Sequence, residues 1–245
     1  MAEGVNDPAV VRREYETEDR FVARRLSTWA ELDGPLVEDV ALAEVGRLDP
    51  KRVLEVGCGT GDFTERVRDG LRGPLVAVDL SVRMAALTKG RRIDALVADI
   101  QRLPFPDGAF DLVLANRVLY HLPDLDRGLG EIARVLVPGG RLVAITYSER
   151  HLEEVGGLLG HAVVGPAFST ESGPRAMERH LATVHHREVS GTAVFRTGAA
   201  LRGFAAQQFG RPDGRRPARL GAAAVPFRAT YRHSIIVGVK PAARP

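Results

Sequence analysis

Residues 53–63 read VLEVGCGTGDF, an apolar run that leads into a glycine-rich turn and then into a polar stretch. A strand, a tight turn and a helix in this order let the backbone approach a ligand closely at the carboxyl edge of a parallel sheet. The glycines at positions 57, 59 and 61 have the spacing G-x-G-x-G. This stretch therefore predicts a ligand site at the end of a buried strand.

The spacing of the turn separates several kinds of nucleotide site. A phosphate-binding P-loop needs G-x-x-x-x-G followed by Lys and by Ser or Thr, and these residues do not follow here. A dinucleotide fingerprint is G-x-G-x-x-G, whereas Asp62 stands in the sixth position of this turn. A carboxylate at a helix N-terminus would repel a pyrophosphate. The turn argues against NAD and leaves open a nucleoside ligand without phosphates.

Short apolar runs alternate with helical stretches on both sides of the turn. The apolar runs are rich in Val, Leu and Ile with little polar alternation, as in strands that are covered on both faces. The expected strands are 51–57, 75–79, 95–99, 110–115 and 141–146, and the expected helices are 62–70, 81–89 and 124–136, with N-caps at Ser81 and Asp124 and a stop at Pro138-Gly139-Gly140. This pattern predicts an α/β fold with a doubly wound, mostly parallel sheet and helices on both faces.

The two flanks are less regular than this core. Residues 8–48 are expected to be helical, with an apolar stripe that packs on the sheet and consists of Leu36, Val40, Leu42, Val45 and Leu48. Residues 186–195 and 231–239 are expected to be strands, with a helix over 197–209 between them and a mobile loop or fraying helix over 209–224.

Composition and charge restrict the class of protein. The chain has 245 residues, of which 44% are apolar and 27% charged, and it has no apolar run long enough to cross a membrane. Its N-terminus lacks a secretory signal, and the single cysteine, Cys58, excludes an internal disulfide. A cytoplasmic location is expected. From Arg196 onward the chain has ten basic residues and one acid, Asp213, so this part could face an anionic partner such as RNA or be a solvated arginine-rich surface.

Two acids at the ends of successive strands support a nucleoside ligand. Asp79 ends the second expected strand, where a carboxylate can accept hydrogen bonds from both hydroxyls of a ribose. Asp99 ends the third expected strand, where a carboxylate can accept the exocyclic amine of adenine. Each acid alone could also be a helix cap or a surface residue. The two together, after a G-x-G-x-G turn, favour the nucleoside.

These motifs resemble the core of class I S-adenosylmethionine-dependent methyltransferases, in particular the branch with ubiquinone-type and natural-product enzymes. The matching text is LEVGCGTGDF from residue 54, VAVDLS from 76, VADIQRLPFPDGAFDLVLANRVLYHL from 97 and EIARVLVPGGRLVAIT from 131. The resemblance implies a Rossmann-like sheet of seven strands, with the last one, 231–239, antiparallel. It divides one domain into an N-terminal helical cap (1–48), a cofactor-binding core (49–148), an insert over the substrate pocket (149–185) and C-terminal strands (186–245).

The resemblance also implies S-adenosyl-L-methionine as cofactor, with S-adenosyl-L-homocysteine as product. The glycine turn would pass under the methionine part, Asp79 would hold the ribose, Asp99 would frame the adenine, and Asn116 would lie near the transferred methyl. Tyr15 and Arg24 loosely resemble residues that close over the cofactor in some relatives. The full implied set is Glu55, Gly57, Cys58, Gly59, Gly61, Asp79, Leu80, Asp99, Ile100 and Asn116.

The expected reaction is methyl transfer to an O, N or activated C atom of a small metabolite in a biosynthetic pathway. Residues 116–119 read NRVL rather than the N-P-P-Y of amino-methylating enzymes, and no metal site is expected. If residues 117–121 form a helical turn, Arg117 and His121 share a face. Arg117 could then hold an anionic or phenolate acceptor while His121 removes its proton, although His121 could also be a packing residue.

Two alternatives to this function remain open. One is an RNA methyltransferase that uses the arginine-rich region 196–232, and the other is a non-catalytic cofactor-binding partner of another enzyme. The first has little support, because that region offers few aromatic side chains for base stacking and no RNA-binding module precedes the core. We therefore expect a small-molecule substrate, no nucleic acid or membrane partner, and a monomer or homodimer.

Overall fold

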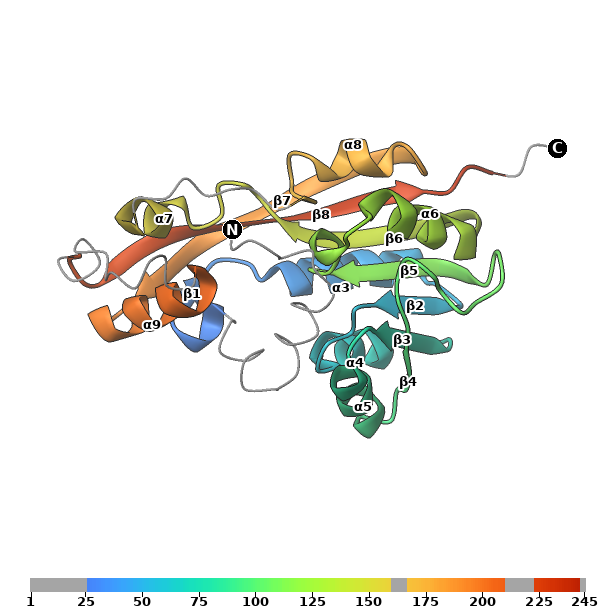
Figure 1. The fold of residues 1–245 in the computed structure, drawn as a ribbon, viewed down its shortest axis with the longest axis horizontal. Coiled ribbons are helices and arrows are strands. Elements are labelled where there is room, and N and C mark those ends of the chain that lie inside the picture. The colour runs from blue at the N-terminus through green and yellow to red at the C-terminus, as the bar shows by residue number, and fades with distance from the viewer. Residues whose placement is uncertain (1–25, 160–166, 210–222, 243–245) are drawn as a thin grey trace.

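A computed structural model describes residues 26–159, 167–209 and 223–242, which form one eight-stranded sheet with helices packed on it (Figure 1). The strand order is β1-β7-β8-β6-β5-β2-β3-β4. The strands are β1 (Glu31–Asp33), β2 (Val53–Val56), β3 (Leu75–Asp79), β4 (Asp94–Val97), β5 (Phe110–Asn116), β6 (Leu136–Tyr147), β7 (Ala182–Phe195) and β8 (Phe227–Val239). The helices are η1 (Leu26–Thr28), α3 (Val37–Leu48), α4 (Asp62–Asp69), α5 (Val82–Gly90), η2 (Leu119–His121), α6 (Leu125–Val135), α7 (Glu153–Leu159), α8 (Gly173–Met177) and α9 (Gly198–Phe209).

The fold class expected from the sequence is confirmed. Strands β6, β5, β2, β3 and β4 run parallel to one another, and α4, α5 and α6 lie between strands where the sequence predicts helices. Strand β8 is antiparallel to β6, as the resemblance implies. All seven expected strands are present, and the three-residue strand β1 adds an eighth at the edge by pairing with β7.

The helix N-caps expected at Ser81 and Asp124 are confirmed. The Ser81 side chain accepts a hydrogen bond from the Met84 backbone N–H at 3.3 Å, and the Asp124 carboxylate accepts one from the Arg127 N–H at 3.0 Å. Each cap satisfies a backbone donor that the first helical turn leaves without an intrahelical partner. These caps fix where α5 and α6 begin, just beyond the carboxyl edge of the sheet.

Strand β6 begins earlier than the sequence suggests. Helix α6 ends at Val135, one residue before the predicted end, and the strand then begins at Leu136 rather than Arg141. The register jumps from Phe110 opposite Leu136 to Leu112 opposite Arg141, so residues 137–140 bulge out of the ladder. Gly139 lies at φ +77°, where a residue with a side chain would be strained. The Pro-Gly-Gly stretch is therefore a bulge within a strand.

The N-terminal flank differs from the expected helix. Residues 8–25 lie outside the described part of the chain, and residues 26–33 form η1 and β1 before α3 begins at Val37. Helix α3 buries Val37, Ala41 and Val45, whereas Leu36 is 39% exposed. The expected stripe was wrong at Leu36, because this residue precedes the helix with an extended backbone.

Strands β7 and β8 form a long ribbon that extends past the parallel core. Strand β6 ends at Tyr147, which pairs with His233, whereas β8 continues back to Phe227 in register with β7. Figure 1 shows the ribbon running beyond the sheet toward α7 and α9. The projecting end has its own apolar cluster, which includes Phe195, Phe204 and Tyr231. The ribbon therefore forms a wall beside the carboxyl edge of β5 and β6.

The insert after β6 packs on this ribbon. Helix α7 contacts β8, and α8 contacts both β7 and β8. Buried hydroxyls hydrogen-bond residues 168–170 of the insert to the sheet. Thr146 Oγ1 of β6 donates to the Phe168 carbonyl at 2.6 Å, and Thr170 Oγ1 donates to Ser234 Oγ of β8 at 2.9 Å. Residues 160–166 and the basic residues 210–222, where the sequence predicts a mobile loop or fraying helix, lie outside the described residues. Within the described part of the chain, none of the helices is long and apolar enough to span a membrane.

Candidate active site

The glycine turn adopts a conformation that only glycine takes without strain. Gly57, Gly59 and Gly61 all lie in the left-handed region, with φ of 72°, 56° and 79°. A Cβ on Gly57 would lie 2.4 Å from Val118 Cγ2, and one on Gly61 would lie 2.8 Å from Thr88 Oγ1. The turn thus packs its backbone closely against Val118 and α5 at the carboxyl end of β2.

Asp79 is held beside this turn by backbone donors. Its Oδ2 accepts a hydrogen bond from the Gly59 N–H at 2.9 Å, and its Oδ1 accepts one from the Ser81 N–H at 2.8 Å. Burial raises the pKa of this carboxyl, although the same backbone donors oppose the shift. Each carboxylate oxygen keeps a lone pair, so Asp79 is fixed in place and still able to accept a ligand's hydroxyls.

Glu55 lies in the middle of β2 and is 1% exposed. Burial raises its pKa from 4.5 to about 8, so the side chain is largely protonated at neutral pH. Its Oε2 is buried and has no hydrogen-bond partner among the described residues. Glu55 is therefore a neutral acid beneath the site, while Cys58, at the start of the turn, is buried and its thiol pKa is raised by burial.

Asp99 follows β4 and Asn116 ends β5, so both lie at the carboxyl edge of the parallel strands. Asp99 accepts hydrogen bonds from the Gln101 N–H at 2.9 Å and from Gln101 Nε2 at 3.2 Å, so it also closes a turn. Ile100 beside it is buried in the core. The Oδ1 of Asn116 is buried and unpartnered among the residues that the structure describes. Asn116 therefore presents an acceptor where β5 ends.

The expected pairing of Arg117 with His121 on one helical face is wrong. Arg117 has φ of +55°, outside the helical region, and the only helical turn nearby is the three-residue η2. Its Nη2 instead forms an ion pair with Glu38 Oε1 of α3. The Arg117 guanidinium carbon lies 5.7 Å from the centroid of the Tyr147 ring. His121 packs against Tyr120, with ring centroids 4.5 Å apart.

The structure adds a group of rings that sequence reasoning missed. Tyr147 from the end of β6 contacts Tyr120, His151 and His233, with ring centroids 5.7, 4.7 and 5.1 Å away. Tyr147 could have been found as the last residue of a parallel strand. The two histidines carry no such signal, because they come from the insert and from a distant antiparallel strand.

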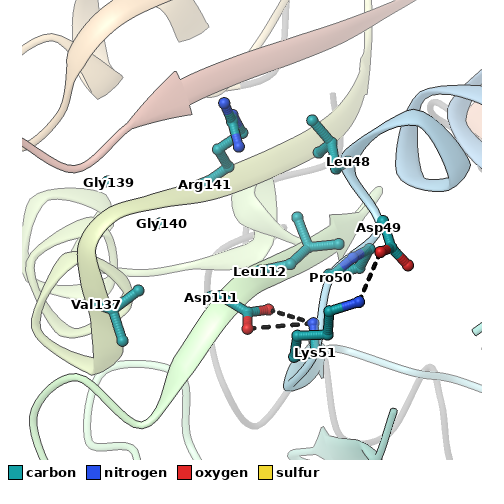
Figure 2. A pocket seen from close by; sticks show the side chains of 10 residues that line it. All are labelled: Leu48, Asp49, Pro50, Lys51, Asp111, Leu112, Val137, Gly139, Gly140 and Arg141. Atoms are coloured by element: carbon teal, nitrogen blue, oxygen red, sulfur yellow. Dashed lines mark hydrogen bonds and ion pairs between the residues drawn. The ribbon is translucent and has the colours of Figure 1, made fainter. Parts of the chain in front are cut away.

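The hollow in Figure 2 lies at the opposite edge of the sheet, where β2 and β5 begin. It has a cavity volume of about 170 Å³. Asp111 accepts hydrogen bonds there from the Lys51 and Arg52 N–H groups at 3.1 Å, and Lys51 Nζ pairs with Asp49 at 2.6 Å. These acids are paired in this way, and the hollow lies at the edge opposite the glycine turn, so we assign it no role in the site. No cluster of potential metal ligands is present in the described part of the chain.

Residues 54–144 match the family model of a methyltransferase domain. The chain is similar to the demethylmenaquinone methyltransferase of Thermus thermophilus, with 38% identity over 105 residues that cover 40% of this chain and 48% of that protein. It is also similar to the malonyl-(acyl-carrier protein) O-methyltransferase of Yersinia pestis, with 36% identity over 107 residues that cover 42% of this chain and 39% of that protein. The chain thus spans less than half the length of either relative.

The fold has a similar counterpart among solved structures. The N-methyltransferase NodS of Bradyrhizobium japonicum, solved with S-adenosyl-L-homocysteine, superposes with a TM-score of 0.57 at 19% identity, over 96% of this chain and 99% of that one. At this identity the likeness concerns the fold. With the family match over residues 54–144, the resemblance to S-adenosylmethionine-dependent methyltransferases is confirmed for the core of the chain.

Proposed function

We propose, from the methyltransferase domain at residues 54–144, that this chain transfers a methyl group from S-adenosyl-L-methionine to a small molecule. The observation that carries the proposal is the left-handed glycine turn with the Asp79 carboxylate fixed beside it by Gly59 and Ser81. When bound, the cofactor supplies the methyl group on a sulfonium. The chain's own residues bind it, orient the acceptor and take up a proton.

The residues at this edge fit the cofactor on three counts. The left-handed glycine turn would lie along the methionine part, and it keeps this course only with glycine, because a Cβ on Gly57 would collide with Val118. Asp79 keeps lone pairs for two ribose hydroxyls. The unpartnered Oδ1 of Asn116 would accept a hydrogen bond from an ammonium group and so gain the partner that it lacks among the described residues. Asp99 and Ile100 would border the adenine.

The acceptor side follows from where β5 ends. Methyl transfer needs the acceptor atom in line with the methyl, and a hydroxyl or amine acceptor must also lose a proton. His121 lies five residues beyond Asn116 and next to Tyr120, so we propose it as the group that takes this proton. The relatives' names specify demethylmenaquinone and malonyl-(acyl-carrier protein), and for this chain we propose a small metabolite of a biosynthetic pathway.

RNA as acceptor has no specific support in the described residues. Arg211, Arg215, Arg216 and Arg219, which would form the basic surface, lie outside them. Arg196, at the start of the same region, is paired with Glu31 at 2.7 Å. RNA therefore enters only as an outcome of the test below.

The proposed function is tested by transfer of labelled methyl from S-adenosyl-L-methionine. The protein is incubated with separated metabolite, protein and RNA fractions of a bacterial extract, with Asp79→Ala as the control. We expect label in the metabolite fraction and almost none with the variant. Label in RNA alone would show that the acceptor is RNA and not a small molecule. Binding of the cofactor without transfer to any fraction would contradict an enzymatic role.

A further inference from the structure

Arg117 has a strained backbone conformation beside the proposed cofactor site. It directly follows Asn116 and has φ of +55°, in the left-handed region where a Cβ is unfavourable. Among the described residues, it is the one non-glycine residue with positive φ that directly follows a parallel strand. Strained residues persist only where the surrounding structure holds them, and they cluster at functional sites. The contacts that hold Arg117 therefore bear on this site.

Contacts from β6 and from α3 hold Arg117 in this conformation. Its N–H donates to the Ile145 carbonyl at 2.9 Å, which continues the pairing of β5 with β6 beyond Asn116. Its guanidinium carbon lies 5.7 Å from the centroid of the Tyr147 ring, within the range of a cation–π contact. Its Nη2 forms the ion pair with Glu38 of α3. The partners in β6 follow β5 in the same sheet, whereas Glu38 precedes the whole parallel core in the chain.

The ion pair between Glu38 and Arg117 is more deeply buried than its neighbour on α3. The side chains of Glu38 and Arg117 are 23% and 26% exposed, whereas those of Asp39 and Arg66, which also form an ion pair, are 55% and 45% exposed. Water screens an exposed pair, which therefore contributes little. Removing one partner of a buried pair leaves a charge without compensation. Glu38 therefore restrains Arg117 more strongly than Asp39 restrains Arg66.

The turn at Arg117 connects two residues of the proposed cofactor site. On one side, Asn116 has a buried Oδ1 that lacks a partner among the described residues. On the other side, Val118 packs against the glycine turn, since a Cβ on Gly57 would lie 2.4 Å from Val118 Cγ2. Because φ and ψ are the only soft torsions of a residue's backbone, the conformation of Arg117 sets how Asn116 and Val118 lie relative to each other.

We propose that Glu38 is a positioning residue of the cofactor site, because its ion pair holds the left-handed turn at Arg117. The turn sets Asn116 for the ammonium group of the cofactor and keeps Val118 against Gly57. Glu38 acts through Arg117 and not through a contact of its own with the cofactor. This inference rests on the proposed function. Glu38 precedes the part of the chain that matches the methyltransferase domain, so the domain match assigns it no role.

Loss of the ion pair should lower the affinity for the cofactor through the backbone strain. Without Glu38, less opposes the relaxation of Arg117 toward negative φ. The free protein would then populate the left-handed turn only in part, and its affinity would fall by that fraction. The usual strain of a left-handed residue corresponds to a loss of about tenfold.

The first test compares Glu38→Gln with Asp39→Asn by calorimetric titration with S-adenosyl-L-homocysteine, at a temperature well below the melting temperature of each variant. Each substitution removes the charge of one ion pair and keeps the shape of the side chain. We expect Glu38→Gln to bind about tenfold more weakly than the wild type. Asp39→Asn should bind like the wild type, because Arg66, the partner of Asp39, lies in α4 and not in the turn at Arg117.

The second test separates the backbone strain from the ion pair with two double variants, Glu38→Gln/Arg117→Gly and Glu38→Gln/Arg117→Ala. Both lack the ion pair, and neither leaves one of its charges buried without a partner. They differ by one Cβ at the left-handed position, where glycine is not strained. We expect the glycine variant to bind S-adenosyl-L-homocysteine about tenfold more tightly than the alanine variant. An ion pair that only stabilises the fold predicts equal affinities.

Two results would overturn the inference alone: a Glu38→Gln variant that loses no more affinity than Asp39→Asn, or equal affinities of the two double variants. If Glu38→Gln does not fold, the double variants still provide the test. Failure of the wild type to bind S-adenosyl-L-homocysteine would contradict the proposed function and overturn this inference with it. The wild-type titration therefore distinguishes the two failures.

Discussion

At the residue scale, burial within the sheet raises the pKa of the Glu55 carboxyl. A carboxyl that is 1% exposed in β2 keeps its proton up to about pH 8, whereas in the unfolded chain it would lose it near pH 4.5. The folded state therefore binds one more proton than the unfolded state between these two values. The protonated carboxyl therefore contributes to the free energy of unfolding. This contribution is fully present below pH 4.5 and is lost as the pH rises toward 8.

Glu55→Gln should remove this pH dependence. Glutamine has the same shape as the protonated acid and does not titrate, so the fall in melting temperature between the two pKa values should become shallower. The measurement is the melting temperature across this pH range, with exposed Glu178→Gln as the control. Parallel curves for the wild type and Glu55→Gln would contradict a buried, protonated Glu55.

His121 is either a general base or a packing residue, and measuring kcat together with the melting temperature separates these two roles. If it takes the acceptor's proton, His121→Asn should lower kcat by about a hundredfold or more, since general bases contribute that much. The melting temperature and cofactor affinity should then stay nearly unchanged. His180→Asn, at a histidine that pairs with Asp126 away from the site, is the control and should leave turnover intact. A destabilised His121→Asn with normal turnover would make this histidine a packing residue.

At the scale of elements, the glycine turn combines backbone conformation with close packing. Gly57 at φ +72° faces Val118, whereas Gly139 at φ +77° has no atom within 4 Å of where its Cβ would lie. The two positions share the same backbone strain and differ in the steric contact. Comparing them isolates what close packing contributes to the cofactor site.

Gly57→Ala should abolish binding of S-adenosyl-L-homocysteine and lower stability, because the turn must shift to relieve a 2.4 Å contact. Gly139→Ala should cost about 1–2 kcal/mol of stability, the usual strain of a left-handed residue, and leave binding unchanged. Calorimetric titration and chemical denaturation of both variants provide the comparison. Normal binding by folded Gly57→Ala would show that the turn does not hold the ligand.

The elements that the sequence predicted well are those whose pattern is local. Strand β3 spans Leu75–Asp79 as expected, because an apolar run between turns leaves few alternatives, and the caps at Ser81 and Asp124 are encoded by single residues. Strand β1 could not be predicted, since three residues acquire their structure only by pairing with β7. The contacts of Tyr147 with His151 and His233 were missed for the same reason, because these rings meet only once β6 and β8 are paired.

At the scale of the whole molecule, the parallel core and the antiparallel ribbon carry different groups of residues. The core carries the glycine turn, Asp79, Asp99 and Asn116 at one edge, and this part matches the methyltransferase domain. The ribbon, with α7 and α9, has a separate apolar cluster, and His233 of β8 contacts Tyr147 at the end of β6. This division explains why the proposed cofactor residues could be predicted from motifs, whereas the rings around Tyr147 became visible only in the fold.

The central claim is that the carboxyl edge of β2 and β3 binds S-adenosyl-L-methionine and its product. Calorimetric titration with S-adenosyl-L-homocysteine tests it most directly, with NADH as the competing ligand and Asp79→Ala as the variant. We predict saturable binding of S-adenosyl-L-homocysteine, a loss of about 1–3 kcal/mol of binding free energy in Asp79→Ala, and no binding of NADH. Binding of NADH without binding of S-adenosyl-L-homocysteine would contradict this claim.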